Sequence, residues 1–498
     1  MLQALARRAR ASASRRGLRH AACETPQPVG WNYPTSIRFG PGRIAEIGVA
    51  CSELGITRPL LVTDPGILNA GTIVADAVEC LGGCPVYGTV RGNPTEADVD
   101  GGVSAFIAND CDGVVAFGGG SAMDAAKCVA LMSGQTRPLF DFEDREDWCD
   151  RVDVAGMAPC VAVPTTAGTG SEVGRAAVVT DERDHTKKII FHANMLPGRV
   201  ILDPELTSKL PPDVTAWTGV DALSHCLEAL ASPVYHPMAL GVALEGTRLV
   251  KDYLERAVAD GSDLEARSQM MVASTLGATA FQKGLGGMHA LTHAAGGLLN
   301  TQHGQTVAVV MPRRAGAGTL RPSPWRACYA LRERAARIAA TLGNYTCRPA
   351  GPAASPRPGS SRQESPRPVL GIYACRPVAS PQPGPGIYTC RPAAARQSSS
   401  LPRYVLEFNR PAVADTFAAV ARYLDLRDQS LTGVVDWVLE LRERVGIPHS
   451  LSALGVSDDD VPTLARMSVA DPSAGTNPIP LVAEDVSDLL RTCIAGKM

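Results

Sequence analysis

The chain has 498 residues, of which 45% are hydrophobic, and its formal net charge at pH 7 is -2. This length allows two or three domains with buried cores, and the nearly balanced charge gives no general attraction to nucleic acid or to an anionic membrane. No apolar run reaches the length of a transmembrane helix, so we expect a soluble protein without a membrane partner.

The first 25 residues differ in composition from the rest of the chain. They are rich in arginine, alanine and serine, hold no acidic residue before Glu24, and can form a short helix with Leu2 and Leu5 on one side. This composition is typical of a transit peptide, and we expect a mitochondrial protein, with a plastid or the cytoplasm as alternative locations. A disordered basic tail is the other interpretation of these residues.

Residues 31–212 alternate short apolar strands with amphipathic helices. Such alternation predicts an α/β domain with a doubly wound parallel sheet that is covered on both faces. A fold of this kind binds ligands at the carboxyl ends of its strands, so we expect a dinucleotide there. The candidate strands are residues 59–64, 113–118, 160–165 and 199–204, with helical patterns at 70–82 and 95–109.

A glycine-rich turn connects the strand at 113–118 to the helix that follows. Gly119, Gly120 and Ser121 form this turn. Glycines here let the backbone approach a pyrophosphate, and the helix N-terminus supplies amide donors. The spacing is not the GxGxxG fingerprint, so a plain tight turn stays open as the alternative. Asp124 is counted with the candidate cofactor residues, although a carboxylate in the first turn of a helix also has a structural explanation.

Two further polar positions follow strands of the same domain. Asp64 ends the first candidate strand, where a carboxylate can bind a ribose and repel a 2'-phosphate, which favours NAD over NADP. Thr165, Thr166 and Thr169 form a hydroxyl-rich turn that can bind a phosphate or the nicotinamide amide. The alternative in each case is a solvent-exposed turn.

Helical periodicity occupies residues 213–312 and 404–498, so we predict a second, all-helical domain. It holds two pairs of side chains four residues apart, followed by one more histidine: Asp221 with His225, His289 with His293, and then His303. On a helix the two side chains of each pair lie on one face, and the two pairs can converge on a single cation. We expect this cation in the cleft between the two domains. A carboxylate with imidazoles and no thiolate suits Fe(II), Zn or a similar ion in a metal-dependent enzyme, whereas satisfied core histidines are the structural alternative.

Residues 313–403 fit neither domain. They are rich in Pro, Ser, Arg and Ala and contain an imperfect repeat at residues 343, 371 and 387, so we expect a disordered insertion. Two explanations compete. The segment is either a genuine disordered loop at the surface of the protein, which chain entropy tolerates, or it is non-coding sequence translated from a faulty gene model. We favour the second because the repeat has no evident role.

Four motifs resemble, in this order, those of the iron-containing (group III) alcohol dehydrogenase family: GGGSAMDAAK, PTTAGTGSEV, the DALSH helix and HALTHAAGGLLNTQHG. The resemblance covers residues 31–312 and 404–490. It implies reversible hydride transfer between a small alcohol or aldehyde and NAD, in a homo-oligomer. By this resemblance Asp221, His225, His289 and His303 bind the metal, and His293 transfers a proton near the nicotinamide. The implied cofactor contacts fall on Asp64, Asn93, Gly119, Gly120, Ser121, Thr165, Thr166, Thr169 and Lys187.

Three other functions stay open. The nearest is a hydroxyacid-oxoacid transhydrogenase for 4-hydroxybutyrate-like substrates, in which the cofactor stays bound. It needs a cationic group for the substrate carboxylate, and the candidates are Lys188, Lys283 and Arg175. The second is a dehydroquinate-synthase-like lyase on the same scaffold. The third is a catalytically silent binding protein, in which the insertion disrupts the helical domain.

Overall fold

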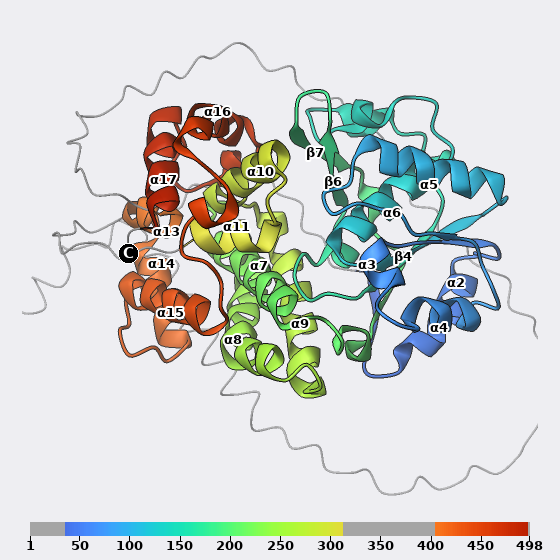
Figure 1. The fold of residues 1–498 in the computed structure, drawn as a ribbon, viewed down its shortest axis with the longest axis horizontal. Coiled ribbons are helices and arrows are strands. Elements are labelled where there is room, and N and C mark those ends of the chain that lie inside the picture. The colour runs from blue at the N-terminus through green and yellow to red at the C-terminus, as the bar shows by residue number, and fades with distance from the viewer. Residues whose placement is uncertain (1–34, 312–403, 497–498) are drawn as a thin grey trace, which may run out of the picture. The chain divides into compact units, whose positions relative to one another are not determined.

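The structure is a computed structural model that describes residues 35–311 and 404–496. The predicted transit peptide at residues 1–25 and the predicted insertion at residues 313–403 lie outside the described residues. Figure 1 shows the described chain from blue at its N-terminal end to red at its C-terminal end.

The N-terminal region is built on a six-stranded sheet in the order β1-β8-β5-β4-β2-β3, and each pair of neighbouring strands is parallel. The four strands that the sequence predicts form its centre. The two edge strands were not predicted, because β1 alternates polar with apolar residues and is partly exposed, and β3 has only two residues. The strands are β1 (Ser36–Phe39), β2 (Pro59–Val62), β3 (Val86–Tyr87), β4 (Gly113–Gly118), β5 (Cys160–Pro164) and β8 (Arg199–Leu202).

Helices cover both faces of this sheet. Helices α2 (Ile47–Glu53) and α4 (Ile73–Cys80) pack on the face that carries Leu61, Val115 and Val161. Helices α5 (Glu96–Ala108) and α6 (Gly120–Met132) pack on the opposite face, with Leu60, Val114 and Ala162. Successive strand residues point to opposite faces, so strands buried on both sides consist of continuous apolar residues. The doubly wound parallel sheet predicted from the sequence is confirmed.

An antiparallel hairpin stands apart from the main sheet. Its strands are β6 (Ala176–Asp181) and β7 (Thr186–Phe191), and Thr180 pairs with Lys187, Val178 with Ile189, and Ala176 with Phe191. The sequence analysis did not predict it, because β7 begins with three polar residues and is half-buried along most of its length. Helix α10 of the helical region packs against β7, so the hairpin lies between the two regions.

From Pro212 onward the described elements are helical, which confirms the second part of the predicted fold class. Their apolar faces meet in one continuous core. None of the described helices is both long enough and apolar enough to span a membrane. The α-helices are α7 (Pro212–Ala231), α8 (Pro237–Ala259), α9 (Leu264–Ala280), α10 (Gly287–Leu299), α11 (His303–Val310), α13 (Val405–Phe408), α14 (Arg410–Tyr423), α15 (Leu431–Arg444), α16 (Val461–Ala470) and α17 (Ala483–Ala495).

The two residues that flank positions 312–403 lie close together. Met311 and Tyr404 are both buried, and the amide of Leu406 donates a hydrogen bond of 3.3 Å to the carbonyl of Met311. The buried guanidinium of Arg442, on α15, donates to the carbonyls of Ala308 and Val309 at the end of α11. The helical core is therefore continuous across this point of the chain.

Candidate functional site

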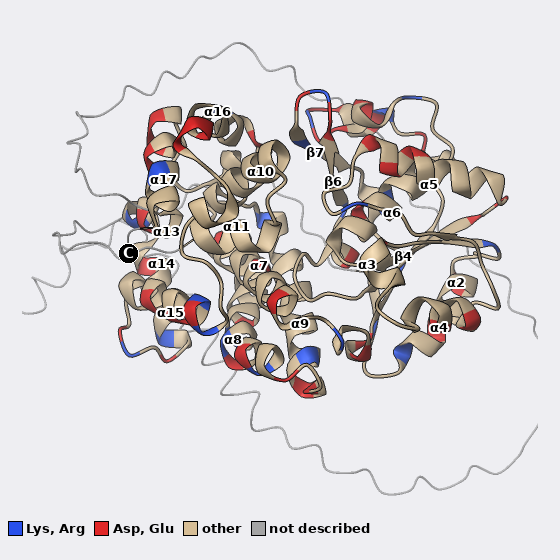
Figure 2. Ribbon diagram, in the orientation of Figure 1, with Lys and Arg blue, Asp and Glu red and all other residues tan. Residues whose placement is uncertain are grey.

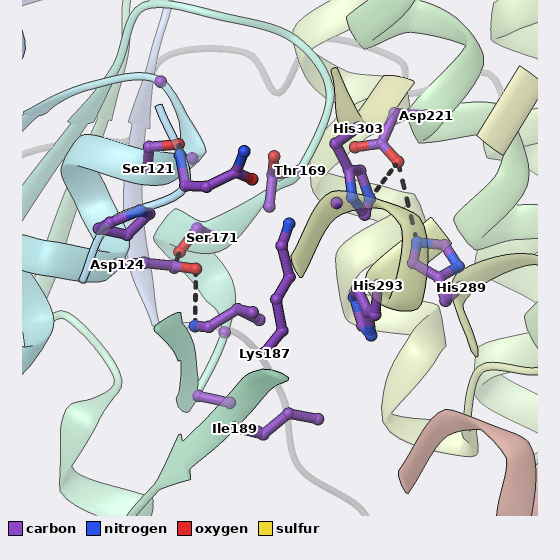
Figure 3. A pocket seen from close by; sticks show the side chains of 18 of the residues that line it. Ser121, Asp124, Thr169, Ser171, Lys187, Ile189, Asp221, His289, His293 and His303 are labelled. Carbon is purple, nitrogen blue, oxygen red and sulfur yellow. Dashed lines mark hydrogen bonds and ion pairs between the residues drawn. The ribbon is translucent and has the colours of Figure 1, made fainter. Parts of the chain in front are cut away.

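A cavity of about 1260 Å³ lies between the sheet region and the helical region. The strand ends and α6 line one side, the face of the β6–β7 hairpin lines the floor, and α7, α10 and the start of α11 line the other side (Figure 3). The predicted cleft between the two regions is therefore present.

The N-terminus of α6 forms the sheet side of the cavity. Gly118 ends β4 with φ of 150°, a conformation that favours glycine, and Gly119 is the N-cap of α6 with no side-chain hydrogen bond to the helix. Gly119, Gly120 and Ser121 all line the cavity, and a Cβ on Gly120 would lie only 2.9 Å from Cβ of Thr169. Because the first amides of α6 have no capping side chain, they are free to bind an anion such as a diphosphate.

Other predicted cofactor residues surround this helix end. Asp64, Asn93, Thr166 and Thr169 line the cavity. Asp64 is also the N-cap of the short helix α3 (Pro65–Leu68), where it accepts a hydrogen bond of 3.1 Å from the amide of Ile67. Burial raises the pKa of Asp64. The carboxylate of Asp64 therefore caps a helix, in addition to the ribose contact predicted from the sequence.

Thr165 does not take the predicted position. It has no solvent exposure and is absent from the residues that line the cavity, whereas its neighbour Thr166 is among them. The cavity lining therefore does not include Thr165, and its contact with the cofactor stays a prediction.

Asp124 lines the cavity, but its structural role differs from the predicted one. It is the fifth residue of α6 and so lies beyond the first turn of the helix. A negative charge stabilises a helix N-terminus mainly from within that first turn. Its carboxylate instead accepts hydrogen bonds of 2.5 Å from Oγ of Ser171 and 2.9 Å from the amide of Val178, and it lies 3.4 Å from Nζ of Lys127. Asp124 thus fixes the hairpin to α6.

The other side of the cavity brings the predicted metal ligands together. Oδ1 of Asp221 lies 3.3 Å from Nε2 of His303 and 3.8 Å from Nε2 of both His289 and His225. The donor atoms of Asp221, His289 and His303 all lie within 4.8 Å of one another. His225 lies beside this group, with its ring stacked on that of His289 at a centroid distance of 4.7 Å. Three separate helices therefore contribute to one cluster.

The electrostatics of the cluster suit a bound cation. Burial lowers the pKa of His225 to about 4 and that of His303 to about 3, so both imidazoles are neutral at pH 7 and keep a lone pair. Burial alone raises the pKa of a carboxyl group, yet the imidazoles around Asp221 hold its pKa well below the usual range. Oδ1 of Asp221 and Nε2 of His289 are buried and have no hydrogen-bond partner among the described residues. Unpaired buried polar atoms are costly, and a cation between them would remove that cost.

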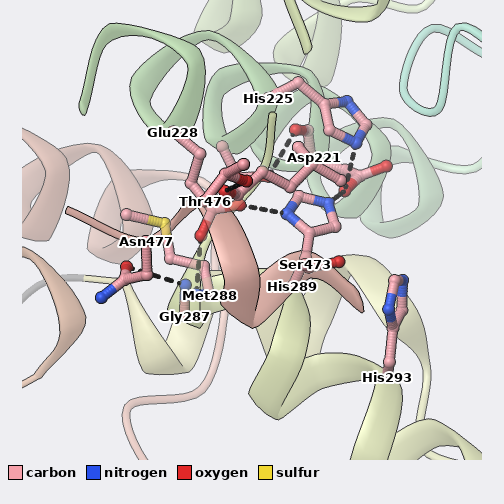
Figure 4. Close-up of polar contacts among 12 residues, drawn as sticks. Asp221, His225, Glu228, Gly287, Met288, His289, His293, Ser473, Thr476 and Asn477 are labelled. Carbon is pink, nitrogen blue, oxygen red and sulfur yellow. Dashed lines mark hydrogen bonds and ion pairs between the residues drawn. The ribbon is translucent and has the colours of Figure 1, made fainter. Parts of the chain in front are cut away.

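Glu228 orients one of these imidazoles, and the sequence analysis missed it. Its Oε2 lies 2.6 Å from Nδ1 of His289, and its Oε1 accepts a hydrogen bond of 2.6 Å from the amide of Met288 (Figure 4). Burial lowers the pKa of His289, but Glu228 outweighs that effect and the pKa lies above its usual value. The hydrogen bond at Nδ1 leaves Nε2 for the cluster. Glu228 follows Asp221 by seven residues on α7, a helical spacing that could have revealed it.

Asp471 is the second residue that the sequence analysis missed. It precedes the short helix η11 (Pro472–Thr476), and its Oδ2 lies 3.0 Å from Nδ1 of His293. Both side chains are nearly fully buried, and although burial raises the pKa of Asp471, His293 holds it below its usual value. Helices α10 and α11 carry no acidic or basic residue except histidine (Figure 2), so the carboxylates of the site come from other elements. No local pattern in the sequence relates Asp471 to His293.

The basic residues considered for the site either line the cavity or form contacts away from it. Lys187 points into the cavity beside α10 (Figure 3), and burial lowers its pKa to about 8. Arg175 also lines the cavity. Two earlier candidates for a carboxylate contact are wrong: Lys188 forms an ion pair of 2.5 Å with Asp181, and Nζ of Lys283 donates to the carbonyl of Ala229 at 2.7 Å, and neither lines the cavity.

Comparison with family models covers most of the chain. Residues 34–204 match the family described as iron-containing alcohol dehydrogenase. Residues 215–353 and 394–494 match the C-terminal part of the Fe-containing alcohol dehydrogenase family. The interruption of the second match falls inside the predicted insertion. These matches agree with the family resemblance drawn from the four sequence motifs.

Comparison with individual proteins gives the same result. The chain is 42% identical over 288 residues to 4-hydroxybutyrate dehydrogenase of Cupriavidus necator, covering 56% of this chain and 74% of the relative. It is 33% identical over 314 residues to NAD-dependent methanol dehydrogenase of Bacillus methanolicus, covering 62% and 78% of the two chains. A solved 1,3-propanediol oxidoreductase superposes with a TM-score of 0.68 at 27% identity, covering 94% of this chain and 100% of the other. The chain therefore belongs to the iron-containing alcohol dehydrogenase family, and it is an NAD-dependent alcohol dehydrogenase.

Proposed function

We propose that this enzyme oxidises a short hydroxy acid of the 4-hydroxybutyrate type, with a divalent cation held by Asp221, His225, His289 and His303. The observation that carries the proposal is the pair of buried, unpartnered atoms, Oδ1 of Asp221 and Nε2 of His289, within one cluster of donors. One carboxylate with three imidazoles suits Fe(II), and Zn is the alternative. The relative named 4-hydroxybutyrate dehydrogenase supports the substrate class.

NAD would lie along the sheet side of the cavity. The uncapped N-terminus of α6, with Gly119, Gly120 and Ser121, suits its diphosphate. Asp64 lines the cavity beyond this turn and suits a ribose, and its negative charge would repel the 2'-phosphate of NADP. Asn93, Thr166, Thr169 and Lys187 supply further polar contacts toward the cation cluster.

His293 is the candidate for proton transfer. Asp471 accepts the hydrogen of Nδ1, which leaves Nε2 as the nitrogen that can take a proton from a substrate hydroxyl. The carboxylate also stabilises the imidazolium that results. The chemistry supplied by the bound groups is polarisation of the alcohol oxygen by the cation and acceptance of a hydride by NAD.

The test uses the purified protein after removal of bound metal with a chelator. Addition of Fe(II) or Zn(II) should restore NADH formation from 4-hydroxybutyrate, and the more effective ion identifies the preferred metal. The His289→Ala variant should bind Co(II), measured by its visible absorption, at least ~100-fold more weakly. His192→Asn is the matched control, because His192 caps a short helix and does not line the cavity. Tight metal binding by His289→Ala would contradict the ligand assignment.

The same assay separates a dehydrogenase from a transhydrogenase. A dehydrogenase releases one NADH for each 4-hydroxybutyrate oxidised. A transhydrogenase would keep the nucleotide bound and form product only when an oxoacid acceptor is added. Release of stoichiometric NADH would therefore rule out the second mechanism.

The location and assembly of the enzyme are separate proposals. The composition of residues 1–25 supports import into mitochondria, which is tested by fusing these residues to a fluorescent protein in cells. A homo-oligomer is expected from the family, and light scattering of the purified enzyme measures it. A diffuse fluorescent signal or a monomeric mass would contradict these two proposals respectively.

A further inference from the structure

The floor of the cavity has two ends, each with a basic residue, that differ in distance from the cation cluster. Thr180 with Lys187, Val178 with Ile189, and Ala176 with Phe191 are paired residues of the β6–β7 hairpin, and all six line the cavity. Side chains of directly opposite residues share one face of a sheet, so these pairs form three successive steps along the floor.

The first of these pairs, Thr180 with Lys187, lies at the cation cluster. Lys187 points toward His303 and His293 (Figure 3), and a Cβ on Gly296 of α10 would lie 3.0 Å from its Nζ. Phe191 follows Lys187 by four residues, which is about 13 Å along an extended strand. The residue next to the Ala176–Phe191 step is Arg175, whose guanidinium carbon lies 5.5 Å from the centre of the Phe191 ring.

Arg175 and Lys187 differ from the other basic residue around the cavity, Arg91, because neither forms an ion pair with a described carboxylate. Among the described residues, Lys and Arg line the cavity at three positions only: Arg91, Arg175 and Lys187. Arg91 is neutralised by Asp98 at 3.1 Å and Glu182 at 3.3 Å. No carboxylate oxygen of the described residues lies within 4.0 Å of Arg175. Asp144 also lines the cavity and forms no ion pair with Arg175 within 4.0 Å, but the charge of Arg175 opposes the rise in the pKa of Asp144 that burial causes.

We propose that Arg175 binds the carboxylate of the substrate and so selects hydroxy acids whose acid group is several carbons from the alcohol. An arginine presents two parallel donors to a carboxylate, and between Lys187 and Arg175 the floor consists of Val178, Ile189, Ala176 and Phe191, which suit a short methylene chain. A 2-hydroxy acid does not fit, because its carboxylate is attached to the reacting carbon and stays at the cation end. This inference rests on the proposed function and names the residue that gives it specificity.

The experiment compares 4-hydroxybutyrate with 1,4-butanediol, which has the same length and no charge. In Arg175→Gln, kcat/KM for 4-hydroxybutyrate should fall by about 10- to 100-fold more than kcat/KM for 1,4-butanediol, since a charged hydrogen-bonded contact is lost. Arg175→Lys should recover part of the difference, because it keeps the charge without the paired donors. Arg183→Gln is the matched control, since Arg183 belongs to the same hairpin, is ion-paired to Asp181 and does not line the cavity.

The outcomes separate this inference from the proposed function. An unchanged ratio of the two kcat/KM values in Arg175→Gln, or a wild-type preference for 2-hydroxybutyrate over 4-hydroxybutyrate, would overturn the role of Arg175 and leave the dehydrogenase intact. A wild-type enzyme that oxidises neither 4-hydroxybutyrate nor the diol would overturn the proposed function itself. Melting temperature and NADH binding of each variant show whether it is folded.

Discussion

The two sides of the cavity are built from different chemical groups. On the sheet side, the proposed binding groups are mainly backbone amides at the start of α6, and the main side-chain feature is the absence of a Cβ at Gly119 and Gly120. On the helical side, every proposed binding group is a side chain, and Asp221, His289 and His303 come from three helices. One side therefore depends on local backbone geometry and the other on the packing of distant segments.

This difference determines what disrupts each side. An added atom should weaken nucleotide binding on the sheet side, because this side must leave space for the nucleotide. Loss of a hydrogen-bond partner should weaken metal binding on the helical side, because each imidazole needs a partner that fixes its orientation. If the two sides are independent, a variant on one side should leave the ligand affinity of the other unchanged.

Among variants that keep all four proposed ligands, the largest effect is expected for Glu228→Gln on the helical side. The neutral amide cannot replace the charge that holds Nδ1 of His289 at 2.6 Å, so Nε2 is less well fixed and less basic. We expect Co(II) or Zn(II) affinity, measured by competition with a chelating dye, to fall by about 10- to 100-fold. NADH affinity, measured by fluorescence, should stay at the wild-type value.

The control for this prediction is Glu255→Gln, which removes an exposed carboxylate that is ion-paired to Arg444 at 2.9 Å. It should bind the metal as the wild-type enzyme does. A Glu228→Gln variant with wild-type metal affinity would show that the packing of α10 alone orients His289.

The next largest effect is expected for Gly120→Ala on the sheet side. Its Cβ would lie 2.9 Å from Cβ of Thr169, a branched side chain with little freedom to move, whereas a Cβ on Gly119 would meet Thr166 at 3.3 Å. We expect the dissociation constant of NADH to rise by about tenfold in Gly120→Ala, which corresponds to about 1.4 kcal/mol, and by less in Gly119→Ala. Metal affinity serves as the internal control. Equal NADH affinity in both variants would contradict the close contact with Thr169.

The same contrast explains how much the sequence revealed. Strands β2, β4, β5 and β8 were predicted because strands buried on both faces are continuous apolar runs. The spacing of Asp221 with His225 predicted their shared helix face, because the pattern is contained within one turn of α7. Residues that act through contacts between distant segments gave no such signal. Asp471 meets His293 across 178 positions of the chain.

Arg175 shows the same limit for specificity. Three basic residues were equal candidates from the sequence, because charge alone does not say which side chains already have partners. The fold separates them, since Lys188 is paired with Asp181 and Lys283 donates to helix carbonyls, while Arg175 lines the cavity. The roles of the individual ligands and cofactor contacts stay predictions until the variants are measured.

The smallest effect is expected when residues 314–401 are removed. The helical side is assembled from segments before and after this stretch, since His289 and His303 precede it and Asp471 follows it. Four remaining residues can span about 13 Å, and Leu406 already donates a hydrogen bond of 3.3 Å to Met311, so the flanking helices can be connected without movement. A shorter connection also loses less chain entropy on folding.

We therefore expect the shortened enzyme to bind metal and NADH within about twofold of the full-length chain and to have no lower melting temperature. Loss of metal binding with NADH binding intact would show that the removed segment supports the helical side, and the two sides would then differ in their dependence on it. The intact mass of the native protein decides whether cells make the segment at all. A mass lower by the mass of this stretch than the mass expected after removal of the transit peptide would show that the gene model is faulty, and the shortened variant would then be the natural enzyme.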